Sequence, residues 1–131
     1  MSDGPTYITV KGLPVVQGAF CHASIDRNRI YISGTIPAYI DDNNAIKRID
    51  GDLYQQTNLT LINIEKILKE CGSSMKYLTK LNVFLKDNNP DRYKLMNDAY
   101  VNFFKIRGLN VPARITVGCG NLALGSDVEI D

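Results

Sequence analysis

Residues 111–131, VPARITVGCGNLALGSDVEID, decide how the rest of the chain is interpreted. Two short runs of alternating side chains, typical of β-strands, flank an irregular connection that contains glycine. In the first run Arg114 and Thr116 fall on one face of the expected strand, away from their apolar neighbours. In the second run Glu129 falls on one face and its apolar neighbours on the other. Two mostly apolar strands therefore offer one guanidinium and one carboxylate.

Arg114 and Glu129 allow two interpretations. An arginine side chain presents a planar fork of donors that matches a carboxylate, and it keeps its charge at neutral pH. In the first interpretation the two residues form a cross-strand ion pair at a sheet edge, which stabilises the fold by about 1 kcal/mol or less. In the second, Arg114 holds the carboxylate of a small ligand. From these two residues alone, the ion pair is the simpler interpretation.

The composition is typical of one globular domain covering residues 1–131. Apolar residues make up 44% of the chain and charged residues 22%, which are ordinary fractions for a globular protein. A net charge of +1 argues against a nucleic-acid partner bound by general electrostatic attraction. No apolar run is long enough to span a membrane, and the first residues lack the pattern of a signal peptide. The three cysteines lack the spacing of a disulfide framework or a metal site, which predicts free thiols in the cytoplasm, with a mitochondrial location also compatible.

The remaining pattern predicts strands, a helix, a strand, a helix and strands. The early strands form a hairpin around Asp26-Arg27-Asn28, and residues 37–50 are a polar loop with room for one short strand. Helices are predicted at residues 51–71 and 90–107, each with an apolar stripe, and the strand at residues 80–86 separates them. Right-handed crossovers then place both helices on one face of a single mixed sheet in an α+β fold. The other face is apolar and uncovered, so a partner subunit is expected there.

His22 is the only histidine, so a site with several histidine ligands to a metal is excluded. In a strand, Cys21 and His22 point to opposite faces and cannot share a proton directly. A Ser33–His22 pair across the hairpin lacks an acid to orient the imidazole. His22 is therefore predicted to line a pocket or an interface instead of acting as a catalytic base.

Four sequence blocks, in this order, resemble the RidA/YjgF family of reactive-intermediate deaminases. They are GAFCHA at residues 18–23, IYISGTIP at 30–37, MNDAYVNFF at 96–104, and VPARITV with LALGSDVEID at the end of the chain. The resemblance covers the chain from about Gly18 onward. It implies a chorismate-mutase-like fold, a single mixed sheet with two helices on one face, and a homotrimer whose sheets meet around a central barrel.

The resemblance also implies an activity. Family members hydrolyse short-lived enamines and imines, such as 2-aminoacrylate/2-iminopropanoate and 2-iminobutanoate, to 2-keto acids and ammonia. No metal or organic cofactor takes part. By position, Arg114 matches the arginine that binds the substrate carboxylate, and Glu129 matches the acid that positions the attacking water. The backbone at Thr116 matches the segment that hydrogen-bonds the imine nitrogen.

The rest of the implied pocket lies between subunits and includes Phe20, Ser33 and Gly34. The missing Cβ of Gly34 lets a ligand approach the backbone closely, with the Ser33 hydroxyl beside it. Phe20 stands where many relatives carry a tyrosine whose hydroxyl group contributes to the pocket. Either His22 or water replaces that hydroxyl group, or the substrate range differs. Relatives also continue the last strand by several apolar residues, which leaves Glu129 near the end of this chain. Two alternative functions are a non-catalytic trimer that binds small carboxylates and an RNase or translation inhibitor.

Overall fold

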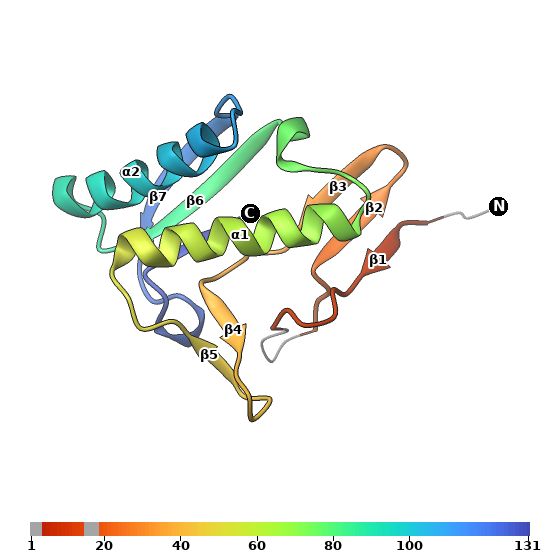
Figure 1. The fold of residues 1–131 in the computed structure, drawn as a ribbon, viewed down its shortest axis with the longest axis horizontal. Coiled ribbons are helices and arrows are strands. Elements are labelled where there is room, and N and C mark those ends of the chain that lie inside the picture. The colour runs from red at the N-terminus through yellow and green to blue at the C-terminus, as the bar shows by residue number, and fades with distance from the viewer. Residues whose placement is uncertain (1–3, 15–18) are drawn as a thin grey trace.

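The computed structural model describes residues 4–14 and 19–131, so Gly18 of the first family block lies outside the described residues. Figure 1 shows the arrangement of the elements. The elements are β1 (Thr6–Ile8), β2 (Ala23–Asp26), β3 (Arg29–Ile32), β4 (Ala38–Ile40), β5 (Ile46–Arg48), α1 (Leu53–Glu70), a 3₁₀ turn (Met75–Tyr77), β6 (Lys80–Lys86), α2 (Pro90–Ile106), β7 (Ala113–Cys119), a second 3₁₀ turn (Ala123–Gly125) and β8 (Val128–Ile130).

Both predicted helices are present, and local side-chain chemistry explains where they begin. Asp52 and Gln55 form a capping box at the start of α1, in which each side chain accepts the other residue's backbone N–H at 2.9 Å. Asn89 caps α2 by accepting the Arg92 N–H at 3.0 Å, and Pro90 follows at the first helical position. These pairings satisfy N–H groups that have no partner inside the helix.

The strands fall into three hydrogen-bonded groups. The first is the antiparallel set β1-β2-β3, and the second is the β4-β5 hairpin, where the sequence predicted a polar loop with at most one strand. The third is mixed, because β6 runs parallel to β7 and antiparallel to β8. Thr35 and Ile130 exchange two backbone hydrogen bonds, of 2.8 and 2.9 Å, which joins the segment after β3 to β8. The predicted α+β fold with mixed strand pairing is confirmed, in three groups instead of one continuous sheet.

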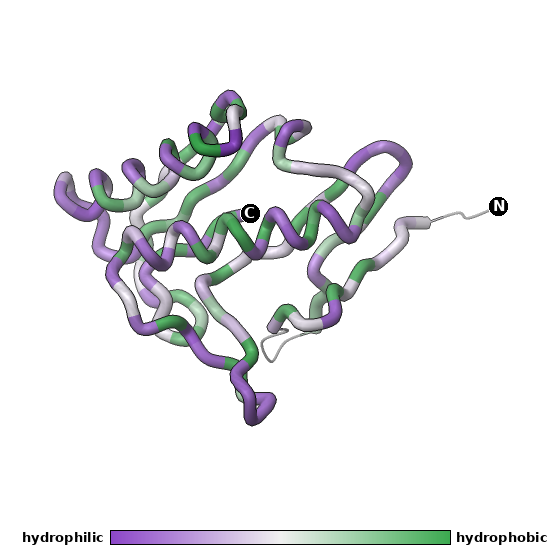
Figure 2. Tube along the Cα trace, viewed as in Figure 1, coloured by the Kyte–Doolittle hydropathy of each residue, from purple (hydrophilic) through white to green (hydrophobic). Residues whose placement is uncertain are grey.

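The helices cover one face of the strands (Figure 1), and the core lies between the two layers. Hydrophobic segments recur along α1 in Figure 2, as expected for a helix with one buried face. On β6 every second residue is fully buried under the helices, and α2 contributes a cluster of aromatic side chains. The largest buried side chains of this core include Leu61, Ile64, Leu81, Leu85, Met96, Tyr100, Phe103, Phe104 and Ile130.

The opposite face of the strands carries exposed apolar side chains. Tyr7 on β1 and Tyr31 on β3 both pair with Ser24 of β2, which lies between them, and they are 66% and 59% exposed. Ile115 and Val117 on β7 are 48% and 39% exposed, and strand alternation turns them away from the helices. The uncovered apolar face predicted from the sequence is therefore present. Within the described residues, neither helix has the length and apolar character needed to cross a membrane.

Candidate functional site

Arg114 and Thr116 point toward the helices. They pair with Leu81 and Val83 of β6, and paired residues of neighbouring strands share a face. Because Leu81 and Val83 are buried under the helices, the Arg114 and Thr116 side chains lie on that side as well. Arg114 is thereby brought to the layer between β7 and α2.

Two tyrosines of α2 contact the Arg114 guanidinium. Nη2 donates a hydrogen bond to Tyr93 Oη at 2.6 Å, and Cζ lies 4.6 Å from the centroid of the Tyr100 ring. Tyr93 and Tyr100 are seven residues apart, which places them two turns apart on one face of a helix. Their spacing was the available sequence signal, but nothing in the sequence linked them to Arg114. We call Arg114, Thr116, Tyr93 and Tyr100 the arginine cluster.

Glu129 points the opposite way. It pairs with Phe84, whereas Arg114 pairs with Leu81, and residues three apart on one strand lie on opposite faces. In addition, β6 lies between the strands that carry the two residues. The cross-strand ion pair between Arg114 and Glu129 is therefore wrong for a single chain. None of the ion pairs found among the described residues includes either side chain.

The Glu129 carboxyl group lies against the backbone of Gly34. A Cβ atom on Gly34 would overlap Glu129 Oε2 and would lie 3.0 Å from its Cδ, so only glycine leaves room for this arrangement. Burial raises the pKa of Glu129 above its ordinary value of 4.5, and the nearby charge of Asp131 raises this pKa further. A carboxylate with a raised pKa is a stronger proton acceptor than an exposed one.

Phe20, Ser33 and Gly34 line a small cavity of about 40 Å³, next to His22 and α1. The Ser33 hydroxyl donates a hydrogen bond to the Cys21 carbonyl, so its proton is already engaged. Gly34 belongs both to this cavity and to the Glu129 contact. We call Glu129, Gly34, Ser33 and Phe20 the carboxylate cluster.

His22 is buried, and both of its ring nitrogens are engaged with the backbone. Nδ1 accepts the Val10 N–H at 2.8 Å, so this nitrogen carries no proton. The proton is therefore on Nε2, which donates to the Pro14 carbonyl at 2.9 Å. His22 forms neither a Cys–His nucleophilic pair nor a Ser33–His22 pair, and it cannot replace the hydroxyl that Phe20 lacks. The prediction that it lines a cavity is confirmed.

The sequence and the fold identify the family to which these residues belong. The family model described as Endoribonuclease L-PSP matches residues 12–131. This chain belongs to that family, RidA/YjgF.

Relatives of the RidA/YjgF chain match over nearly its whole length. Protein MMF1, mitochondrial, from Saccharomyces cerevisiae is 31% identical over 126 residues, which cover 96% of this chain and 81% of the relative. The 3-aminoacrylate deaminase RutC from Acinetobacter baylyi is 31% identical over 123 residues, which cover 94% of this chain and 91% of the relative. The crystal structure of the Rid-family protein YyfA from Yersinia pestis superposes with a TM-score of 0.81 at 30% identity, covering 97% and 95% of the two chains. The family fold predicted from the sequence is thus confirmed.

Two hydroxyl groups of the arginine cluster are buried without a hydrogen-bond partner among the described residues. They are Tyr100 Oη and Thr116 Oγ1. Burial raises the pKa of Tyr100 to about 12, against the opposing effect of the Arg114 charge, so this hydroxyl keeps its proton near neutral pH. Buried hydroxyl groups normally have a partner, and the arginine cluster therefore has capacity to bind a polar group.

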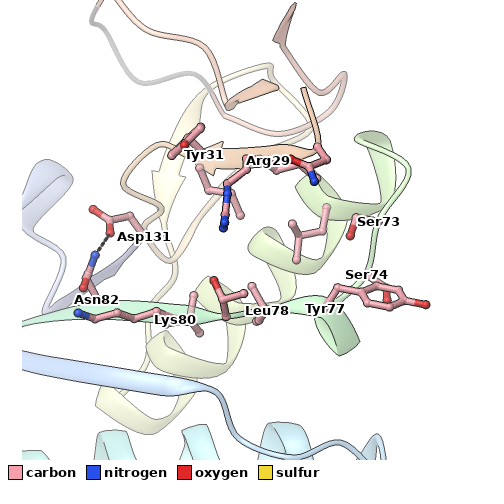
Figure 3. A pocket seen from close by; sticks show the side chains of 15 residues that line it. Arg29, Tyr31, Ser73, Ser74, Tyr77, Leu78, Lys80, Asn82 and Asp131 are labelled. Carbon is pink, nitrogen blue, oxygen red and sulfur yellow. Dashed lines mark hydrogen bonds between the residues drawn. The ribbon is translucent and has the colours of Figure 1, made fainter. Parts of the chain in front are cut away.

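A separate cavity of about 470 Å³ lies between β3 and the beginning of β6. Figure 3 shows Arg29 and Tyr31 on one side of this cavity and Lys80 on the other, with Asn82 hydrogen-bonded to Asp131 at 2.8 Å. All six predicted site residues lie outside the lining of this cavity. Within residues 4–14 and 19–131, no group of three or more His, Cys, Asp or Glu side chains is arranged to hold a metal ion.

Proposed function

We propose that this chain hydrolyses short-lived imines and their enamine tautomers, 2-aminoacrylate/2-iminopropanoate and 2-iminobutanoate, to 2-keto acids and ammonia. The observation that carries the proposal is Arg114, whose charge has no acidic partner among the described residues. A small substrate with a carboxylate would supply that partner. A relative named 3-aminoacrylate deaminase supports the same reaction class.

The complete site requires two copies of the chain. Arg114 and Glu129 lie on opposite faces of one sheet, so a small substrate cannot contact both within one chain. In a ring of copies, the arginine cluster of one chain meets the carboxylate cluster of the next. A homotrimer, as the family resemblance implies, then contains three such sites and covers the apolar sheet face.

In the proposed reaction, an enamine first gains a proton at its β-carbon and loses one from its nitrogen, which converts it into the imine. Arg114 binds the carboxylate, and the backbone at Thr116 accepts a hydrogen bond from the imine nitrogen or donates one to it. Glu129 takes a proton from water as the water oxygen bonds to the imine carbon. The nitrogen takes the proton held by Glu129 and then the proton of the new hydroxyl group, the C–N bond breaks, ammonia leaves, and the oxygen stays on the carbon as a ketone. Because an imine is already electrophilic, holding it and aiming one water supply most of the catalysis.

We expect the protein to be a trimer at micromolar concentration by light scattering or sedimentation. Val117→Asp should dissociate it and abolish hydrolysis, because an unpaired charge buried between subunits is strongly unfavourable. The matched control is Ile106→Asp, at a side chain of α2 that is 68% exposed and outside the apolar sheet face. A wild-type monomer that hydrolyses imines at full rate would contradict the two-chain site.

Phe20→Tyr is expected to raise imine turnover by up to about 10²-fold without changing the trimer, because general acid assistance has that typical size. His22 cannot already provide this assistance, since both of its nitrogens are bound to backbone groups. The measurement is kcat for imine hydrolysis on wild type and variant. An unchanged or lower rate would show that the pocket needs no hydroxyl at this position.

Phe20 also favours one alternative, a trimer that binds small carboxylates without turnover. One assay separates the two functions: the protein is added to a serine or threonine dehydratase reaction that contains semicarbazide. Hydrolysis of the imine before it is trapped lowers the amount of semicarbazone formed, whereas a binding protein at catalytic concentration leaves it unchanged. We place the activity in the cytoplasm, and the name of the yeast relative MMF1 makes mitochondria the second compartment to test.

A further inference from the structure

Arg114 is oriented by aromatic side chains. Its Cζ lies 4.6 Å from the Tyr100 ring centroid and 5.6 Å from the Tyr93 ring centroid. Its one hydrogen bond to a described residue runs from Nη2 to Tyr93 Oη at 2.6 Å. The remaining N–H groups of the guanidinium are left for another acceptor. Arginine over an aromatic face is held in place without losing its capacity to bind an anion.

Arg107, also next to α2, shows the contrasting arrangement. Its Nε and Nη2 donate to the two carboxylate oxygens of Glu65 at 2.8 and 3.1 Å. Its Nη1 donates to the Phe103 carbonyl at 3.1 Å, and its Cζ lies 3.5 Å from the Phe103 ring centroid. Arg107 is thus satisfied by the fold. The two arginines therefore differ in their hydrogen-bond acceptor: Arg107 donates to a carboxylate, whereas Arg114 donates to a tyrosine hydroxyl group.

We propose that Tyr93 is a positioning residue that also binds the substrate carboxylate, an inference that rests on the proposed function of Arg114. The phenol oxygen accepts a hydrogen bond from Arg114 and still has its own proton to donate. Donated to the carboxylate that Arg114 holds, this proton adds a third hydrogen bond to the two of the guanidinium fork. The Tyr93 side chain is 37% exposed, so a ligand can reach its hydroxyl group.

The other hydroxyl groups of the arginine cluster do not duplicate this role. Tyr100 contributes its ring, and no described residue is bonded to its buried hydroxyl. Thr116 Oγ1 also has no hydrogen-bond partner among the described residues, Arg114 included. Removing the Tyr93 hydroxyl would therefore leave the guanidinium over its rings but without the one bond that fixes its rotation.

The test compares Tyr93→Phe with Tyr77→Phe. Tyr77 is a matched control because it is exposed and also has a cation near its ring, with Lys76 Nζ 5.7 Å from the centroid. Calorimetry measures binding of pyruvate, which has a carboxylate, and of pyruvamide, which is its neutral analogue. Steady-state kinetics measures KM and kcat for imine hydrolysis on the same preparations, after melting curves establish that each variant is folded.

Tyr93→Phe is expected to weaken pyruvate binding and to raise KM by about tenfold, the usual effect of losing one hydrogen bond to a charged group. The kcat value should change much less, and pyruvamide binding should not change. Tyr77→Phe should match wild type in every measurement. Because Tyr93→Phe keeps the ring and changes only a partly exposed hydroxyl, it is expected to fold normally.

Equal pyruvate affinity in wild type and Tyr93→Phe would overturn the inference, whatever the hydrolysis rate. An equal loss for pyruvate and pyruvamide would overturn it too, since the hydroxyl would then not act on the carboxylate. If pyruvate binding weakens in Tyr93→Phe but wild type hydrolyses no imine, the proposed function fails and the role of Tyr93 stands. If wild type binds no pyruvate, both are overturned.

Discussion

Arg114→Ala is expected to lower imine hydrolysis by about 10²-fold or more, because it removes both the binding and the alignment of the substrate carboxylate. Arg114→Lys should be impaired almost as much, since an ammonium group keeps the charge but lacks the planar fork. The melting temperature should change little. Arg114 forms no ion pair with a described residue, so alanine removes its contact with the Tyr100 ring and its hydrogen bond to the partly exposed Tyr93 hydroxyl group, each worth about 1 kcal/mol or less.

Arg107→Ala is the matched control for Arg114→Ala. Arg107 lies against the same helix layer and is paired with Glu65 through two hydrogen bonds, so its loss should destabilise the fold by about 1–2 kcal/mol. Hydrolysis by the folded fraction should remain near wild type. Melting temperature and hydrolysis rate are measured on the same preparations. Arg114→Ala should lower mainly the hydrolysis rate, whereas Arg107→Ala should lower mainly the melting temperature. An Arg114→Ala trimer with near-wild-type activity would contradict the assignment of this residue.

The elements of the fold were predictable because their signals are local. Asn89 before Pro90 identifies the start of α2, and alternating side chains give the same bounds for β6, Lys80–Lys86, as the structure has. The β4-β5 hairpin was not predicted, since its strands have only three residues each and residues 41–44 between them are all polar. Such short strands are specified by pairing with each other more than by the pattern within either one.

The relation between Arg114 and Glu129 could not be predicted from the same pattern. Alternation shows which residues of one strand share a face, but not which face of the sheet that is. β7 and β8 are consecutive in the chain, yet they lie on either side of β6. This order follows from the parallel crossover between β6 and β7, which depends on tertiary packing. That Arg114 and Glu129 cannot meet within one chain therefore becomes apparent only in the structure.

The members of the two clusters differ in how far the sequence identified them. Strand alternation singled out Arg114, Thr116 and Glu129, and the blocks that resemble the family then gave these residues their roles. Tyr93 lies outside those blocks, and its pattern predicted only one face of a helix. Its bond to Arg114 joins residues 21 positions apart, and the contact depends on how α2 packs against β7. A positioning residue of this kind can be identified from the structure but not from a sequence motif.

Glu129→Gln should reduce imine hydrolysis by about 10²-fold or more, because glutamine has nearly the same shape but cannot accept a proton from water. The pKa of Glu129 is raised by burial, and only the ionised form acts as a base, so the wild-type rate should fall as the pH is lowered through this raised pKa. That acidic limb should lie above the ordinary carboxyl value of 4.5 and should be missing in the variant. The measurement is the pH profile of kcat for both proteins.

The same pKa shift predicts the direction of the change in stability. A carboxyl group whose folded pKa lies above its unfolded value stabilises the fold at low pH, and this contribution is lost as the pH rises through the folded pKa. At neutral pH, ionised Glu129 therefore lowers the free energy of unfolding, and the neutral amide in Glu129→Gln should keep or raise the melting temperature. A catalytic base predicts loss of activity with preserved or increased stability, whereas a structural carboxylate predicts loss of stability with activity retained in the folded fraction. The second outcome would remove Glu129 from the proposed mechanism.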